Sequence, residues 1–480
     1  MLGSSKAALS MARGKEFVET LLHNKPVRFV VTALLLLAYI LMLHALLGQY
    51  IGRKGVVYLG AGTALLALTY LKGIEVLVNS AVFACSLFAT SSFLFAFFEA
   101  FPGLIPRFHL NILPYYSARL DTVPDPILRK RNRPLFSTRI LDFRGSDYSP
   151  IYGIDVPPTT VDWSTDEEGF RNSATIRRAD IAVIGDSLVE YGDNEADTFG
   201  KRLGKLTAMT VKNLGVSGYG PDQYLEVLKR YGVKLRPKYA FFSFYEGNDI
   251  ADIREYRRFR QGDPNAGLGE VFSDSFWRRY KVAVTETINY LQNTFSVASL
   301  LVYKSLSGTD SKAHPDVAVL NLNGQYSRRR FFSLFSVKRD AHVQEMLGSW
   351  EWQRLKQILV EFRSVCVANN ISPVIIYIPS DVHIYATYST QDSGENWREQ
   401  RDRQIALKDN AEKAMKQVAQ ELHVDMISLT PVFKAAANAG KMLYYSLDSH
   451  WNSEGRAVAA EYVAGILRER QTNSRDAKMR

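Results

Sequence analysis

The sequence predicts an α/β domain with a parallel sheet, preceded by an N-terminal unit of about three transmembrane helices. Three long apolar stretches lie within the first 101 residues. From Asp180 onward, short β-rich runs alternate with amphipathic helical segments. The chain has 480 residues, of which 46% are hydrophobic, so it is long enough for two or three domains and too apolar to be largely disordered.

The N-terminal unit is expected over residues 27–101, with membrane spans at about 29–47, 55–71 and 76–98. None of these stretches contains Asp, Glu, Lys or Arg. A helix of about 20 apolar residues crosses the hydrocarbon core of a membrane, whereas a soluble helix of this length would show a polar face. The second stretch is short, so a buried helix of a soluble domain stays an alternative for it.

The segment before the first span, residues 1–26, is expected to lie in the cytoplasm because positive charge tends to stay there. The basic residues at the start of the chain are Lys6, Arg13, Lys15, Lys25 and Arg28. Three spans place the chain after Pro102 outside the cytoplasm, so we expect a multi-pass protein of the bacterial inner membrane with a periplasmic catalytic domain. If the second stretch does not span, that domain would be cytoplasmic.

After the spans we expect an extracytoplasmic linker over residues 102–160, which is rich in Pro, Arg and Tyr. The α/β domain follows over 161–470. Its near-continuous apolar strands indicate a parallel sheet covered by helices on both faces. The stretch 250–345 is too long for a loop and is interpreted as an inserted cap or subdomain. The expected strands are 181–184, 211–216, 239–245, 373–378 and 424–429, and the expected helices include 222–231, 350–369 and 409–422.

Charge and composition exclude several classes of protein. The net charge of +10 is spread along the chain, whereas a nucleic-acid binder concentrates basic residues on one face. Two cysteines are too few for a disulfide scaffold or a multi-cysteine metal site. There is no P-loop, HExxH or EF-hand pattern, and we expect neither a cofactor nor a metal.

Three short motifs follow successive expected strands. Gly185-Asp186-Ser187 follows the first, which places the serine hydroxyl at the carboxyl edge of the sheet and its N–H at a helix N-terminus. Gly218 lies in a glycine-rich loop after the second, where the backbone can approach a ligand closely. Asn248 follows the third, where its amide can donate to an oxyanion. Each motif alone also fits an ordinary helix cap or loop.

A fourth motif near the C-terminus contains Asp448-Ser449-His450-Trp451. A serine nucleophile needs a base to take its proton and an acid to orient that base, and His450 and Asp448 supply both. A surface loop is the alternative interpretation. Because all four motifs follow strands of one sheet, they are expected to converge on one edge, which favours a catalytic site.

Together these motifs resemble those of the SGNH (GDSL-type) hydrolase superfamily, over roughly residues 161–470. The resemblance implies a flavodoxin-like three-layer domain with Ser187 as nucleophile, His450 as general base and Asp448 as its orienting acid. It also implies an oxyanion hole formed by the N–H groups of Ser187 and Gly218 and by the amide of Asn248.

Two further segments refine the resemblance. Gly169-Phe170-Arg171-Asn172 looks like the segment found upstream of the first SGNH block. Many members have Asp three residues before His, whereas here the spacing is two, and Asp-Ser-His-Trp is similar to the catalytic segment of alginate-type polysaccharide O-acetylation proteins.

The resemblance implies an ester hydrolase or O-acetyltransferase that forms an acyl-enzyme on Ser187 and acts on an extracytoplasmic carbohydrate or polysaccharide, with acetyl as the expected acyl group. A transferase would need an acyl donor delivered by a partner, for which we expect a membrane-bound O-acyltransferase. A non-catalytic glycan-binding or assembly component and a membrane-proximal lipid esterase stay open as alternatives. The arginines at 254, 257, 258, 260 and 328–330 are interpreted as a solvated face, with a basic rim for an anionic glycan as the alternative.

Overall fold

The computed structural model describes residues 74–101, 121–142, 154, 156, 159–263, 275–285, 287, 317–330, 342–389 and 395–479. The chain divides into two compact units. Unit 1 comprises Met1–Ile105 and Ser275–Ile288, and unit 2 comprises Pro106–Asp274 and Asn289–Arg480. The predicted spans 29–47 and 55–71 lie outside the described residues.

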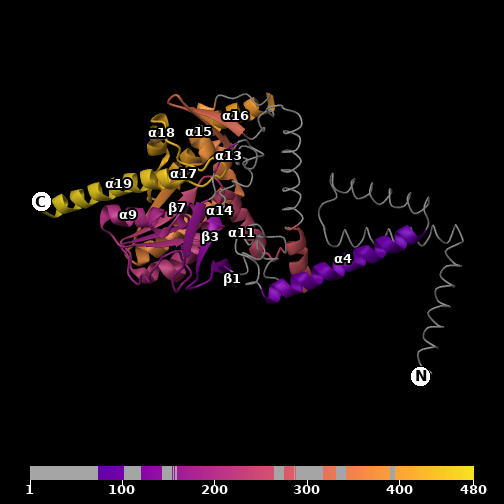
Figure 1. Ribbon diagram of the computed structural model, residues 1–480. Helices are drawn as coiled ribbons and strands as arrows, with labels where there is room; N and C mark the ends of the chain where they lie inside the picture. The colour runs from indigo at the N-terminus through magenta and orange to yellow at the C-terminus, as the bar shows by residue number, and fades with distance from the viewer. Residues whose placement is uncertain are drawn as a thin grey trace, which may run out of the picture. The chain divides into compact units, whose positions relative to one another are not determined.

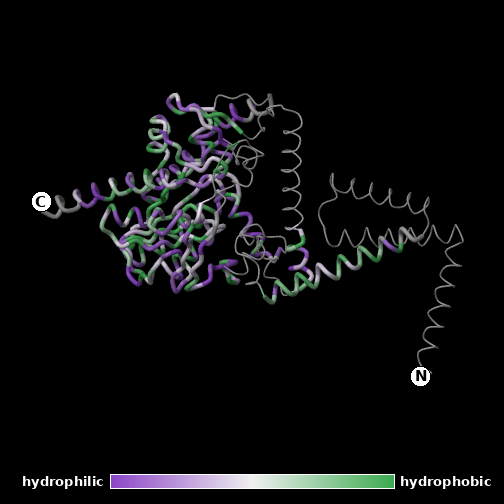
Figure 2. The backbone as a smooth tube through the Cα atoms, viewed as in Figure 1, coloured by the Kyte–Doolittle hydropathy of each residue, from purple (hydrophilic) through white to green (hydrophobic). Residues whose placement is uncertain are grey.

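Unit 1 contains α4 (Ile74–Ala100), which includes the third predicted span. Its segment Ala81–Ala100 has a mean hydropathy of 2.0 and is long and apolar enough to cross a membrane, and it is the one such helix among the described residues. Figure 2 shows α4 coloured as hydrophobic along most of its length. Residues 276–285 are helical and pack on α4, where the rings of Phe276 and Phe95 lie 5.3 Å apart. Part of the expected insertion therefore belongs to unit 1.

Unit 2 is built on a five-stranded parallel sheet with the order β11-β10-β7-β5-β6. Its central strand, β7, is labelled in Figure 1. All five expected strands are confirmed to within one residue at their ends. They are β5 (Ile181–Gly185), β6 (Val211–Gly215), β7 (Tyr239–Tyr245), β10 (Ser372–Ile378) and β11 (Asp425–Ser428). If β5 is taken as the first strand, this order is flavodoxin-like. In such sheets ligands bind at the carboxyl ends of the strands, at the point where the strand order reverses. Here that point lies between β5 and β7.

Successive strand residues enter two separate cores, because side chains alternate across a strand. Val183 and Ile376 face a core closed by α9, α18 and α19, whereas Ile184 and Ile375 face a core closed by α10, α14 and α17. The expected three layers are therefore present. The helices of unit 2 are α8 (Ser187–Glu190), α9 (Phe199–Thr207), α10 (Pro221–Val227), α11 (Asp249–Arg260), α13 (Val343–Gly348), α14 (Trp350–Ala368), α15 (Asp381–Tyr385), α16 (Glu395–Leu407), α17 (Asn410–Glu421), α18 (Thr430–Asn438) and α19 (Ser453–Met479).

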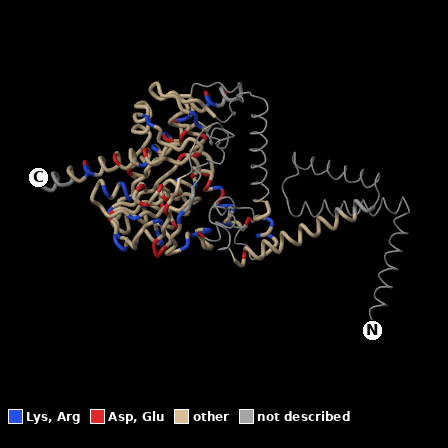
Figure 3. Tube along the Cα trace, viewed as in Figure 1, with Lys and Arg blue, Asp and Glu red and all other residues tan. Residues whose placement is uncertain are grey.

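The described part of unit 2 also contains three two-stranded antiparallel ribbons. They are β1 (Thr122–Asp125) with β2 (Arg129–Asn132), β3 (Ser137–Asp142) with β4 (Thr159–Ser164), and β8 (Val317–Leu322) with β9 (Gln325–Arg330). β1, β2 and β3 lie in the stretch expected to be a linker, and the Tyr219 hydroxyl donates to the Lys130 carbonyl at 2.5 Å. Ala318 and Leu320 of β8 are buried in the first core. Both stretches therefore contribute to the folded domain, and its charges of both signs are interspersed (Figure 3).

Candidate active site

Ser187 is the first residue of α8, which follows β5 after a sharp turn. Asp186 caps this helix, since its Oδ1 accepts from the Leu188 N–H at 2.9 Å. The chain passes so closely here that a Cβ on Gly185 would lie 2.5 Å from Cγ2 of Val189. The turn holds Ser187, which is 7% exposed, at the carboxyl end of β5.

His450 joins the serine to the carboxylate. Its Nε2 lies 2.8 Å from Oγ of Ser187, and its Nδ1 lies 2.6 Å from Oδ1 of Asp448. The same carboxylate oxygen accepts from the His450 main-chain N–H at 3.1 Å. In this arrangement a proton on Nδ1 points to the carboxylate, which leaves Nε2 to accept the proton of Ser187. The ring of Tyr191 packs edge-on against the imidazole, with the centroids 5.1 Å apart.

Two of the three predicted oxyanion donors, Gly218 and Asn248, lie in loops that other residues fix. Gly218 has a φ of +75°, which is strained for any residue with a Cβ, and its carbonyl accepts from Nη2 of Arg129 at 2.9 Å. Asn248 occupies the N-cap position of α11 without a side-chain capping bond, and its Nδ2 donates to Oδ2 of Asp186 at 3.3 Å. Because a primary amide carries two N–H bonds, the second stays available for an oxyanion.

Three carboxyl groups, those of Asp186, Asp249 and Asp252, lie near Asn248. Burial raises the pKa of Asp186, and burial and the charge of Asp186 raise the pKa of Asp249 well above its usual value. Burial, followed by the charge of Asp186, raises the pKa of Asp252 to about 7. Asp249 accepts from the Tyr224 hydroxyl at 2.8 Å and from the Tyr245 N–H at 2.9 Å. These bonds fix the end of β7, from which Asn248 follows.

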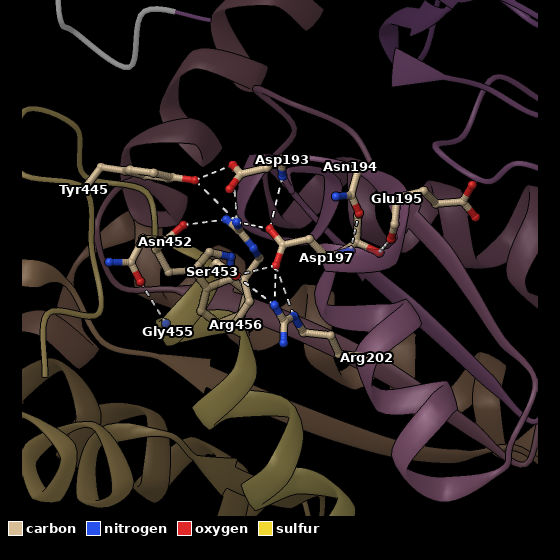
Figure 4. Close-up of polar contacts among 12 residues, drawn as sticks. Asp193, Asn194, Glu195, Asp197, Arg202, Tyr445, Asn452, Ser453, Gly455 and Arg456 are labelled. Atoms are coloured by element: carbon tan, nitrogen blue, oxygen red, sulfur yellow. Dashed lines mark hydrogen bonds and ion pairs between the residues drawn. The ribbon is translucent and has the colours of Figure 1, made fainter. Parts of the chain in front are cut away.

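A buried ion pair ties the segment after Ser187 to the segment around His450 (Figure 4). The side chain of Arg456 is fully buried, pairs with Asp197 and donates to the Trp451 carbonyl at 2.7 Å. The hydroxyl of Tyr445 donates to Oδ1 of Asp193 at 2.6 Å. The structure thus brings Ser187, His450 and Asp448 into contact, and Asn248 is bonded to Asp186 beside them. The loop of Gly218 is tied to the same strand end, because the Val216 N–H donates to the Gly185 carbonyl at 3.1 Å.

The upstream segment Gly169-Phe170-Arg171-Asn172 also braces the site. Asn172 Oδ1 accepts from the Asn213 N–H in β6 at 3.1 Å, and Arg171 Nη1 donates to the carbonyl of Glu190 in α8 at 3.2 Å. The segment therefore links the end of α8 to β6.

The prediction of a solvated face is wrong for Arg329, whose side chain is fully buried, while Arg328 beside it is exposed. A local signal was available, because Asn323-Gly324 between two β-rich runs is typical of a tight hairpin. Alternation along the second strand then places Arg329 and Arg328 on opposite faces.

Residues 334–479 match the model of a family described as SGNH hydrolase-like domain, acetyltransferase AlgX. The match contains Asp448 and His450 and begins after Ser187, Gly218 and Asn248. It confirms the expected resemblance to the alginate-type branch of the SGNH superfamily. No curated protein sequence matches this chain.

Similar solved structures include a lipolytic protein of the G-D-S-L family from Desulfitobacterium hafniense, with 10% identity over 60% of this chain and 98% of that chain and a TM-score of 0.29. The psychrotrophic esterase EstA from Pseudoalteromonas is 10% identical over 61% and 98%, with a TM-score of 0.26. A mutant of Axe2, an acetyl-xylooligosaccharide esterase from Geobacillus, is 11% identical over 62% and 96%, with a TM-score of 0.28. These values are too low to carry an argument.

Proposed function

We propose that the protein transfers an acyl group through an ester on Ser187. The premise is that the C-terminal part of this chain belongs to the SGNH hydrolase-like family of acetyltransferase AlgX type. The observation that supports this most is the continuous chain of short contacts from Ser187 Oγ through the His450 imidazole to Asp448, at 2.8 and 2.6 Å. A purely structural histidine would not need a serine hydroxyl on one nitrogen and a carboxylate on the other.

In the proposed reaction, Oγ of Ser187 attacks the carbonyl carbon of an acyl ester while its proton passes to Nε2 of His450. The negative oxygen of the tetrahedral intermediate accepts from the N–H groups of Ser187 and Gly218 and from Nδ2 of Asn248. The C–O bond to the leaving alcohol breaks, and that alcohol takes the proton from His450. A second alcohol, or water, then attacks the acyl-serine while its proton passes to His450. As the bond to the serine breaks, His450 returns a proton to Oγ of Ser187.

Intact-mass spectrometry of the detergent-solubilised full-length chain tests this proposal. The protein is mixed with an activated aryl acetate, beside a Ser187→Ala control. We expect one added acetyl group in the wild type and none in the variant. Slow decay of the adduct in water favours a transferase, and fast turnover without an adduct favours an esterase. Absence of both products in the wild type would favour a glycan-binding or assembly role.

The proposed acceptor is a carbohydrate hydroxyl, and the arginines of α11 support one that carries acidic groups. Arg254 pairs with Glu351, and Arg258 pairs with Glu255 and Asp263, whereas Arg257 and Arg260 make no ion pair with any described residue. These two line a groove of about 410 Å³, together with Tyr256 and Trp350. Three carboxylates also line it, Asp222, Glu226 and Glu361, and each is paired with Arg354 or Lys229. Arg257 lies over the Trp350 ring and Arg260 donates to the Pro126 carbonyl at 3.3 Å, so no described carboxylate neutralises either guanidinium. This favours an anionic ligand.

Replacing Arg257 and Arg260 together by Gln tests the acceptor. We expect acetyl transfer to a carboxylated oligosaccharide to fall while hydrolysis of an aryl acetate stays unchanged. An Arg254→Gln variant on the same helix is the matched control. Equal loss of both reactions would contradict a role in acceptor binding, and preferred hydrolysis of lipid esters would favour the lipid esterase.

We further propose that the apolar segment Ala81–Ala100 belongs to an anchor of about three spans in the bacterial inner membrane, with unit 2 in the periplasm. The acyl donor would be supplied by a membrane-bound O-acyltransferase. Protease protection in spheroplasts tests the location of unit 2, and co-purification from native membranes tests the partner. Acetyl transfer by the pure protein from a soluble donor at full rate would contradict the need for a partner.

A further inference from the structure

We infer that Arg329 is a positioning residue for the loop 444–452, which carries Asp448 and His450. Arg329 lies on β9, outside the four motifs that define the site. Its Nη2 donates to the main-chain carbonyl of Asp448 at 3.2 Å, and its Nη1 donates to the carbonyl of Tyr445. This role rests on the proposed function, in which Asp448 orients His450.

The two carbonyls that Arg329 holds are the ends of one tight turn, since the Asp448 N–H also donates to the Tyr445 carbonyl at 3.4 Å. A guanidinium is a planar fork of donors and can hold both carbonyls at once, whereas an ammonium group is a point charge on a flexible stem. The fork therefore fixes the orientation of the turn as well as its distance from β9.

Arg329 is itself held in place. Its Nη2 pairs with Oδ2 of Asp381 at 2.8 Å, and both side chains are fully buried. The guanidinium lies 5.5 Å from the ring centroids of both Tyr385 and Tyr444. A buried charge is costly unless its donors are used. Here a carboxylate and two carbonyls accept from the two Nη groups, whereas the Nε is buried without a partner among the described residues.

The loop is held at its other end by a second fully buried arginine, Arg456, which donates to the Trp451 carbonyl. His450 lies between the carbonyls held by Arg329 and the one held by Arg456. Its contacts with Asp448 and Ser187 are short, so a displacement of about 1 Å would break them, and an error of that size costs about 100-fold in rate. Arg329 is thus placed to affect the reaction without touching the substrate.

The test compares Arg329→Lys with Arg328→Lys in the full-length protein, because Arg328 is the exposed neighbour on the same strand. We measure aryl acetate hydrolysis, thermal unfolding and the low-field proton NMR resonance of the hydrogen bond between Asp448 and Nδ1 of His450. For Arg329→Lys we expect kcat to fall by about 10- to 100-fold with KM unchanged, and the low-field resonance to weaken or vanish. Arg328→Lys should match the wild type in all three.

A wild-type kcat and a wild-type low-field resonance in a folded Arg329→Lys protein would overturn the inference. A lower unfolding temperature with both values unchanged would show a purely structural role, which also overturns it. If the wild type hydrolyses no ester, the proposed function fails, whereas the NMR comparison still decides the role of Arg329. If Arg329→Lys does not fold, Asp381→Asn replaces it, because this change removes the charge that holds the Arg329 guanidinium. Wild-type kcat and a wild-type low-field resonance in Asp381→Asn would likewise overturn the inference.

Discussion

Replacing Asp252 by Asn should stabilise the protein at alkaline pH and leave it unchanged in acid. Asp252 is mostly buried in the first turn of α11, and its Oδ2 has no hydrogen-bond partner among the described residues. Burial and the charge of Asp186 raise its pKa from 3.8 to about 7. The folded state therefore binds a proton that the unfolded chain releases above pH 4, so the free energy of unfolding falls as pH rises from about 4 to about 7.

The size of the effect follows from the two pKa values. Their difference corresponds to about 4 kcal/mol above pH 7, and relaxation around the charge makes this an upper bound. We expect Asp252→Asn to gain about 2–4 kcal/mol at pH 8, which for a domain of this size is a rise of about 3–6 °C in the unfolding temperature. At pH 4 the two proteins should unfold at the same temperature.

Differential scanning fluorimetry of the detergent-solubilised chain at pH 4, 6 and 8 measures this. Glu255→Gln is the matched control, since it makes the same chemical change at a half-exposed position on the same helix. Its effect should stay within about 0.5 kcal/mol at every pH. An equal gain at pH 4 and pH 8, or a loss at pH 8, would refute the assignment of a strained carboxylate to Asp252.

Three further predictions concern other buried groups. Burial alone would lower the pKa of His383, but its contacts with Glu246 and Asp409 have the larger effect and raise this pKa. The stabilising charge of the imidazole is therefore present in acid and lost as pH rises. His383→Gln should lower the unfolding temperature more at pH 6 than at pH 9. Burial raises the pKa of the Cys366 thiol to about 12, so thiol titration should detect it only after denaturation. Gly218→Ala should lower kcat about 10²- to 10³-fold in a folded protein, because the φ of +75° disfavours a Cβ; unchanged kcat would remove Gly218 from the oxyanion hole.

The sheet and its catalytic edge could be predicted because they rest on local signals. Each strand is a short apolar run, and Ser187 and Asn248 follow two of these runs directly. The hairpin signal at Asn323-Gly324 indicates that Arg328 and Arg329 face opposite sides of a strand, but it does not show that either is buried. The burial of Arg329 and Arg456 could not be predicted, because the burial of a charge depends on a partner from a distant segment. Those partners are Asp381 on α15 and Asp197 before α9, and no spacing in the sequence reveals either pair.

The strands within the expected linker, residues 102–160, were hard to predict from the sequence for a different reason. Residues 121–132 show no periodicity, since β1 and β2 are each four residues long. Their main-chain carbonyls accept from Gln223 and Tyr219, and the Arg129 side chain donates to Gly218. Contacts made through the main chain leave little trace in residue type. Only the folded structure therefore shows that this ribbon supports the glycine loop of the site.

The buried ion pair between Arg329 and Asp381 could serve the stability of the fold or the position of Asp448, and a measurement of stability alone does not distinguish the two. Replacing a buried ion pair by apolar side chains of similar volume is often neutral or stabilising, whereas removing one partner is costly. We therefore expect the double variant Arg329→Met with Asp381→Leu to unfold at the wild-type temperature or above it. Its kcat should nevertheless fall, because no side chain then holds the carbonyls of Tyr445 and Asp448. Retention of wild-type kcat by this stable variant would show that the loop keeps its own geometry, whereas a stable but slow enzyme would show that the ion pair specifies the position of Asp448.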